Sequence, residues 1–173
     1  MSGKIDVRRT AFFGVMLALA LVLSFVEHHL PSPGMPGIKL GLANVVALLL
    51  LYRTGFSGAL TVNVLRIVVA NLLFGSAASM LYGLAGGISA VLCMALLYRL
   101  PRLSAVGVSA AGGIVHNIAQ LVCAAAVTES FAVFAYAPVL LISGTLCGVI
   151  TGFCAAGTIR ALPNSRKEVK KEK

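Results

Sequence analysis

The stretch "GMPGIKLGLANVVALLLLYR", residues 34–53, decides the fold. Prolines and glycines lead through Lys39 to Asn44, and an unbroken apolar run follows as far as Arg53. The apolar run over residues 40–52 predicts a helix that is shorter than its neighbours. The question is why Lys39 and Asn44, both polar, stand at the start of this apolar run.

Composition places the chain in a membrane. Of its 173 residues, 59% are hydrophobic and 11% are charged, which is far from the balance of a soluble domain. We predict an all-α integral membrane protein with one membrane domain, residues 1–160, and a basic cytoplasmic tail, residues 161–173. The net charge of +9 is read as a membrane-topology signal, with no nucleic-acid partner.

Six apolar runs are separated by charges, prolines and glycines. They cover residues 10–26, 40–52, 56–74, 77–98, 104–127 and 132–159. The first run follows a basic segment, as in a signal peptide, but prolines replace the cleavage site and we expect a retained helix. The second is short for a span of roughly 20 residues, so residues 37–40 are candidates for non-helical chain within the membrane. Such chain is tolerated only where protein or a wet cavity satisfies its backbone.

Basic residues fix the expected orientation. In a six-span model, twelve of the 14 lysines and arginines fall on one side. These are Lys4, Arg8, Arg9, Arg53, Arg99, Arg102, Arg160, Arg166, Lys167, Lys170, Lys171 and Lys173. The positive-inside rule therefore predicts a multi-pass cell-membrane protein with both termini in the cytoplasm. Attraction of the tail to anionic membrane lipid is expected as well.

Arg66 lies within the third run, with Asn63 on the same helical face and Asn71 nearer the outer end. A charge inside a membrane is costly and marks a candidate functional site. We therefore predict that Arg66 and Asn71 bind a ligand. The alternative is an arginine tied to helix-end carbonyls, Glu27 or Glu129.

The fifth run carries His116, Asn117 and Gln120 within five residues. His116 and Gln120 share a helical face. Amides in membrane helices often join neighbouring helices, and this is the alternative to ligand contact. Because the expected depths of these groups agree with that of Arg66, we predict one polar pocket in the middle and outer half of the bundle.

Lys39 and Asn44 complete the predicted pocket. A cation and the free backbone N–H groups of a helix start favour an anionic or strongly hydrogen-bonding solute that enters from outside. A lysine that anchors the chain at the membrane interface is the alternative. The predicted substrate-binding residues are Lys39, Asn44, Arg66, Asn71, His116, Asn117 and Gln120.

Small residues and cysteines are assigned to packing. Gly144, Gly148 and Gly152 recur every four residues, as do Gly83 and Gly87, which lets helices approach closely. The four cysteines, inside apolar runs without a Cys-x-x-Cys spacing or a histidine partner, predict small buried hydrophobes: Cys93, Cys123, Cys147 and Cys154. We expect no metal and no cofactor.

The segments "GIKLGLANVVALLLLYR", "NVLRIVVANLLFG", "LYGLAGGISAV" and "HNIAQLV" resemble a bacterial family labelled Gx transporter or heptaprenyl diphosphate synthase component I. That family is similar in size and six-helix plan to the substrate-binding S components of energy-coupling factor transporters. The resemblance implies capture of a vitamin-like solute and toppling of the subunit on a coupling subunit with paired ATPases. It implies that Gly14 and Ala18 contact the coupling subunit. The segment at residues 76–83 departs from the usual pattern, so no ligand contact is carried onto it.

Three functions follow. The first is a solute-binding transport subunit without its own ATPase, because the chain has no Gly-rich phosphate loop with Lys-Ser/Thr. The second is a noncatalytic membrane partner of polyprenyl diphosphate or quinone metabolism. Catalysis of prenyl transfer is not expected, because it needs clustered aspartates for magnesium and the chain has one, Asp6. The third is a structural membrane scaffold.

Overall fold

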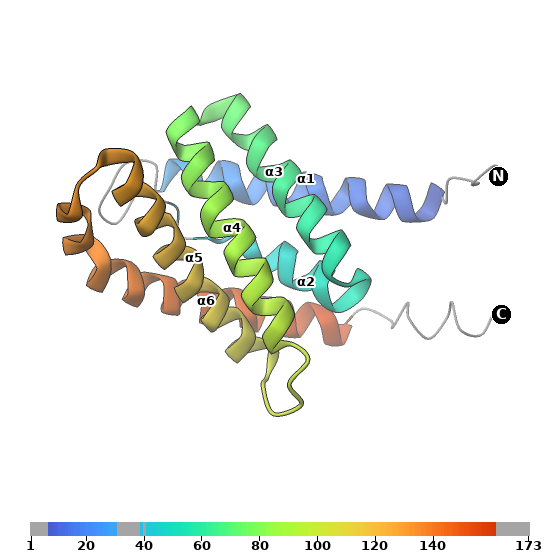
Figure 1. Cartoon of the computed structure of the whole chain (residues 1–173). Coiled ribbons are helices and arrows are strands. Elements are labelled where there is room, and N and C mark those ends of the chain that lie inside the picture. Colours follow the sequence, from blue (N-terminus) through green and yellow to red (C-terminus); the bar gives the residue numbers. More distant parts are fainter. Residues whose placement is uncertain (1–6, 31–38, 40, 162–173) are drawn as a thin grey trace.

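The computed structural model describes residues 7–30, 39 and 41–161. The described residues form six α-helices and a short 3-10 helix. The elements are α1 (Val7–His29), α2 (Asn44–Thr54), α3 (Phe56–Phe74), α4 (Ala77–Leu97), α5 (Ala105–Thr128), η1 (Phe131–Tyr136) and α6 (Ala137–Ala161). The first residues of α1 and the last residues of α6 lie toward the same end of the bundle (Figure 1). The predicted helical class is confirmed.

Five helical segments of the described chain are long and apolar enough to cross a membrane. They are Val7–His29, Phe56–Phe74, Ala77–Leu97, Ala105–Thr128 and Phe131–Ala161. The sixth, α2, has 11 residues and is therefore about 16 Å long, roughly half of the 30 Å hydrocarbon core. The predicted short second helix is confirmed, and the chain has the form of a multi-pass membrane protein.

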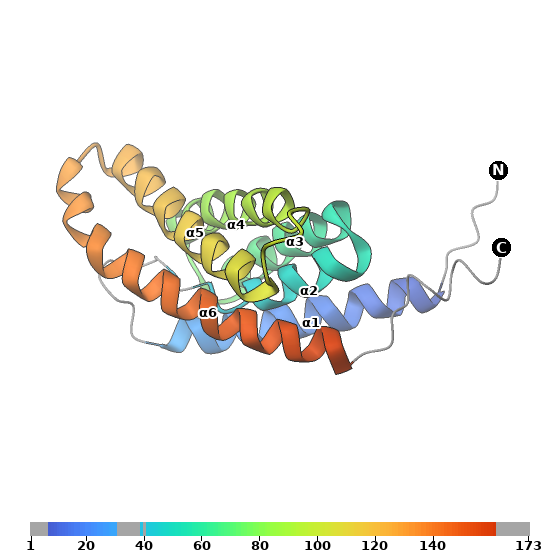
Figure 2. The same ribbon diagram turned by 90° about the horizontal axis from the view of Figure 1, so that it is seen from below.

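Helix α2 lies at the centre of the bundle. It contacts each of the other five α-helices, and Figure 2 shows it between the layer of α3 and α4 and the layer of α1 and α6. Leu48, Leu50 and Leu51 on α2 are at most 1% exposed. An apolar helix this short is stable here because protein surrounds it, which explains why the run 44–51 is almost continuously hydrophobic.

Two glycines adopt backbone conformations that the turns around α2 require. Gly41 (φ 85°) precedes the helix and Gly55 (φ 89°) separates it from α3. Both values lie in the left-handed region, where residues with a Cβ are strained. Residue 39 is non-helical, as expected, but residues 41–43 are non-helical too, so α2 begins at Asn44 and not at residue 40 as predicted, because Gly41 adopts a left-handed conformation there. The other residues of the predicted entry segment, 37, 38 and 40, lie outside the described part.

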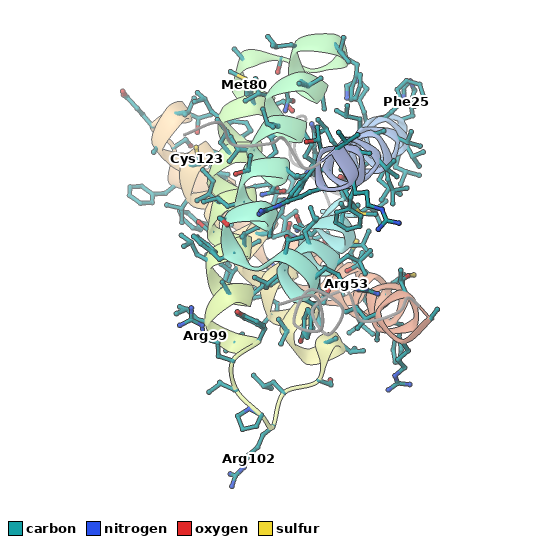
Figure 3. All side chains as sticks on the ribbon, turned by 90° about the vertical axis from the view of Figure 1, so that its right-hand side faces the viewer. Phe25, Arg53, Met80, Arg99, Arg102 and Cys123 are labelled. Carbon is teal, nitrogen blue, oxygen red and sulfur yellow. The ribbon has the colours of Figure 1, made fainter. Side chains whose placement is uncertain are left out.

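The polar ends of the helices bear on the predicted orientation. Arg99 and Arg102 lie around the α4–α5 loop at the bottom of Figure 3, whereas Met80 at the start of α4 and Phe25 near the end of α1 lie toward the top. Arg99 and Arg102 thus lie at the connection between two spans, where the topology argument placed them. The tail beyond residue 161 and the segment before residue 7 lie outside the described part, so the orientation stays a prediction.

The most extensive packing joins α5 and α6. A Cβ added at Gly113 would lie 2.3 Å from the Gly144 carbonyl oxygen, and one added at Gly148 would lie 2.7 Å from the Ala110 Cα atom. Neighbouring backbones therefore touch, and the predicted packing role of the helix-six glycines is confirmed. Gly83 and Gly87 likewise face Ile67 on α3. Of the four cysteines predicted to be buried, Cys147 is buried on α6 and Cys93 and Cys123 are half-buried. The prediction is wrong for Cys154, which is exposed because it lies off the buried stripe of α6.

We expect Gly148→Ala to lower the free energy of unfolding by about 1 to 3 kcal/mol, because the new methyl group would press on α5 backbone. Thermal unfolding in detergent, followed with a thiol-reactive dye, measures the change. Gly157→Ala is the matched control on the same helix, since a Cβ there meets nothing within 4 Å, and it should stay within about 0.5 kcal/mol. Equal effects of the two substitutions would contradict close α5–α6 packing.

Candidate functional site

Glu27 in the last turn of α1 supports the chain that leads into α2. Its Oε1 accepts hydrogen bonds from the backbone N–H groups of Gly41 and of Leu42, the latter at 3.2 Å. The side chain is 5% exposed. Backbone donors inside a membrane protein need internal acceptors, and a carboxylate is a strong one. Glu27 therefore fixes the non-helical entry of α2 against α1.

Lys39 lies in the non-helical chain before α2 and is hydrogen-bonded to side chains of α3 and α5. Its backbone N–H donates to Gln120 Oε1 at 3.3 Å, and its Nζ donates to Asn71 Oδ1 at 3.0 Å. The Asn71 amide in turn donates to the Ile67 carbonyl oxygen at 2.7 Å. Lys39 lies between α1 and α2 in the chain and contacts α3 and α5. The lysine is thus turned inward.

Arg66 joins three helices through neutral oxygens. Its Nε and Nη2 donate to Asn63 Oδ1 at 3.1 and 2.9 Å, Nη1 donates to Ser24 Oγ at 3.2 Å, and Nη2 donates to Asn44 Oδ1 at 3.3 Å. These bonds use four of the five guanidinium N–H groups. Among the described residues, the expected alternatives (helix-end carbonyls, Glu27 or Glu129) are not its hydrogen-bond partners. The positive charge of Arg66 is therefore solvated by dipoles and not neutralised by a bonded carboxylate.

His116 is connected to Arg66 through Asn44. Because a guanidinium only donates, Asn44 Oδ1 faces Arg66 and Asn44 Nδ2 faces His116 Nδ1, at 3.4 Å. His116 Nδ1 must then accept, which leaves its proton on Nε2 and makes the ring neutral. The network thus assigns two cations, Lys39 and Arg66, and an uncharged histidine to this region.

These groups surround a small enclosed cavity of about 10 Å³, which is room for about one water molecule. Its polar lining residues come from α1, the α2 entry, α3 and α5, and they are Glu27, Lys39, Arg66, Asn71, His116 and Gln120. Gly41 and Gly83 bring backbone close to the same space. The bundle therefore contains a polar cavity with one carboxylate and two cations in an otherwise apolar protein.

The structure brings together most of the residues predicted from the sequence. Lys39, Arg66, Asn71, His116 and Gln120 line the cavity, and Asn44 joins two of them behind it. Asn117 is buried but turns toward α6, where its Nδ2 donates to the Leu140 carbonyl oxygen at 2.6 Å. The helix-joining alternative therefore describes Asn117 in this structure. That any of these residues binds a ligand stays a prediction.

Sequence reasoning left two residues of this polar network out of the predicted site. Ser24 bonds Arg66, and Glu27, which was expected only as an alternative partner of Arg66, lines the cavity. The available signal was their spacing of three residues, which places them on one helical face. α1 has only one other buried residue, Ala20. Two of the three fully buried residues of α1 are therefore polar.

A second hollow lies between the first half of α1 and α3. This groove has a volume of about 440 Å³ and its lining includes Arg9, Phe13, Gly14 and Leu65. Gly14 and Ala18, the predicted partner-contact residues, are exposed on α1. Neither is part of the polar cavity. No group of three or more His, Cys, Asp and Glu side chains within the described residues has the geometry of a metal site.

The fold and the cavity together define a multi-pass helical membrane protein with an enclosed polar site. The sequence matches the family described as heptaprenyl diphosphate synthase component I over residues 16–158. The chain belongs to that family, as the resemblance of its segments indicated. A search of curated proteins finds no match. The similarity to S components of energy-coupling factor transporters stays a prediction.

Asn117→Ala should lower the free energy of unfolding by about 1 kcal/mol, because it removes a hydrogen bond between α5 and α6 within the apolar bundle. Thr145→Ala is the matched control, since its hydroxyl bonds only the Leu141 carbonyl oxygen of its own helix and is exposed. Thermal unfolding in detergent measures both variants. Unchanged stability of Asn117→Ala would contradict the structural role given to this amide.

Proposed function

We propose that this chain is a noncatalytic, S-component-like subunit of a membrane transport system that captures a small solute bearing an anionic group. In this proposal the termini face the cytoplasm and the cavity opens toward the outside of the cell membrane. The observation that carries the proposal is the placement of Lys39 and Arg66 at one enclosed cavity. Buried ionisable groups in a membrane bundle mark solute pathways and binding sites more often than structural contacts.

The charge of the cavity supports an anionic group on the solute. One carboxylate, Glu27, and two cations, Lys39 and Arg66, leave one positive charge in excess if His116 is neutral. Arg66 is already positioned by Asn63, Ser24 and Asn44, so it needs little reordering to bind. A guanidinium held in place by neutral oxygens retains its attraction for an anion.

Binding requires the contacts of Lys39 to be exchanged. The cavity has room for about one water molecule, so a solute must replace the Nζ contact with Asn71 or the backbone contact with Gln120. The backbone hydrogen bond is worth about 1 kcal/mol net, and the hydrogen bond of the ammonium group about 1.5 to 3 kcal/mol. A charged solute group that pairs with the released ammonium offsets that loss.

Coupling to an ATPase would use another surface. Gly14 and Ala18 are exposed on α1, and Gly14 borders the groove against α3. Small residues let a partner helix approach closely. In the proposal an energy-coupling membrane subunit docks there, away from the solute cavity.

The second candidate is a noncatalytic membrane partner in polyprenyl diphosphate or quinone metabolism. The description of the family, one component of a heptaprenyl diphosphate synthase, favours this candidate and a protein partner. The single aspartate of the chain, Asp6, argues against a magnesium-dependent catalytic role. The same two cations would then bind the head group of an isoprenoid lipid.

Arg66→Ala should remove solute binding at a cost of about 2 to 5 kcal/mol, because it deletes a buried charge that pairs with the solute. Native mass spectrometry of the protein purified in mild detergent is expected to show a retained water-soluble small molecule in the wild type and none in the variant. Arg99→Ala, an exposed cation in the α4–α5 loop, is the control and should retain it. If Arg66→Ala does not fold, Arg66→Lys, which keeps a cation at the site, is measured in its place. Undiminished binding by Arg66→Ala would exclude this site.

The second candidate predicts a different result. Cells that lack the protein should have altered quinone tail length or abundance, which lipid extraction and mass spectrometry measure. Complementation with the wild-type chain should restore the normal profile. A normal quinone profile in the deletion strain would exclude the isoprenoid role and leave the transport proposal standing.

A further inference from the structure

The carboxylate of Glu27 is not explained by capture of a plain anion. One oxygen, Oε1, accepts from Gly41 and Leu42, whereas Oε2 is buried and has no hydrogen-bond partner within the described residues. Glu27 lines the same cavity as Lys39 and Arg66. A carboxylate oxygen without a partner in a buried site is costly unless something donates to it.

A donor on the opposite side of the cavity is also unused. Gln120 Oε1 accepts from the Lys39 backbone, which leaves the Gln120 Nε2 group to donate, and this atom is buried without a partner. Gln120 is 0% exposed. The cavity lining therefore offers one unused anionic acceptor, Glu27 Oε2, and unused donors on Gln120 Nε2 and His116 Nε2 beside the two cations.

We propose that the solute is a compact zwitterion of the amino-acid type, with its carboxylate bound by Lys39 and Arg66 and its ammonium group bound by Glu27 Oε2. This inference rests on the proposed solute-binding function and names the class of solute. Because Glu27, Lys39 and Arg66 all line one small cavity, the two charges of a solute that all three bind must lie close together, and Lys39 must exchange its contacts to make room for it. An α-amino acid or a β-amino acid meets that requirement.

Electrostatics separates a zwitterion from a plain anion. An anion held by Lys39 and Arg66 would stand close to the Glu27 carboxylate in a site of low dielectric constant, where like charges repel strongly. An ammonium group on the same molecule replaces that repulsion with an ion pair and donates to the unpaired oxygen. A site built to accept from a donor strongly rejects an analogue that lacks it.

Matched pairs of compounds test the inference on the full-length protein in detergent. Each proteinogenic L-amino acid, and β-alanine as a β-amino acid, is compared with the carboxylic acid that lacks its amino group, for example alanine with propionate and aspartate with succinate. Isothermal titration calorimetry measures both affinities. We expect at least one amino acid to bind at least about tenfold more tightly than its partner acid, because only the amino acid satisfies Glu27.

Glu27→Gln provides the matched variant. Glutamine keeps an oxygen that can accept from Gly41 and Leu42, but it removes the negative charge and presents a donor where Oε2 stood. The preference for the amino acid should then fall to within about threefold, chiefly through weaker amino-acid binding. Glu129→Gln, at an exposed acid that ends α5, should leave the preference unchanged. If Glu27→Gln does not fold, the comparison of amino acid with partner acid in the wild type still tests the inference.

Two results would overturn the inference. Equal or tighter binding of the partner acids by the wild type would exclude a zwitterion, while loss of that binding in Arg66→Ala would leave the proposed capture of an anionic solute intact. Absence of binding by all of the amino acids would also exclude it. The proposed function is tested separately, by whether native mass spectrometry finds a retained small molecule that is lost in Arg66→Ala.

Discussion

The structure depends on satisfying the backbone just before α2 inside the bundle. A chain that is not helical has free N–H groups, and lipid offers no acceptor for them. Glu27 from α1 accepts from Gly41 and Leu42, and Gln120 from α5 accepts from Lys39. These two side chains allow α2 to be short and central, and they also bring Lys39 and Glu27 to one cavity.

Arg66 extends this constraint to α3. Its guanidinium donates hydrogen bonds to Ser24, Asn63 and Asn44. One side chain therefore joins the start of α2, the middle of α3 and the last turns of α1. Asn44 then fixes the orientation and proton of His116 on α5. Polar side chains from four parts of the chain thus form one network, and a change at one of them alters the position or charge of the others.

The packing of α5 against α6 stabilises the bundle through residues that do not line the cavity. Between membrane helices the hydrophobic effect contributes little, so close backbone contact matters most. The glycines that join α5 and α6 provide that contact, and Asn117 adds a hydrogen bond to the same interface. The face of α6 away from α5 carries exposed apolar side chains such as Ile150 and Phe153, as expected for a surface that meets lipid.

The sequence alone determined the helices, because apolar runs bounded by charge and glycine leave few other choices in a membrane. It also identified Lys39, Arg66 and His116, since polar groups in apolar runs are conspicuous. Only the tertiary structure decided that Glu27 belongs with them and that Asn117 does not line the cavity. Glu27 ends a helix and Asn117 adjoins His116, so their roles depend on which helix lies opposite. Periodicity along one chain fixes the face a residue occupies, but the facing partner follows from how six helices pack.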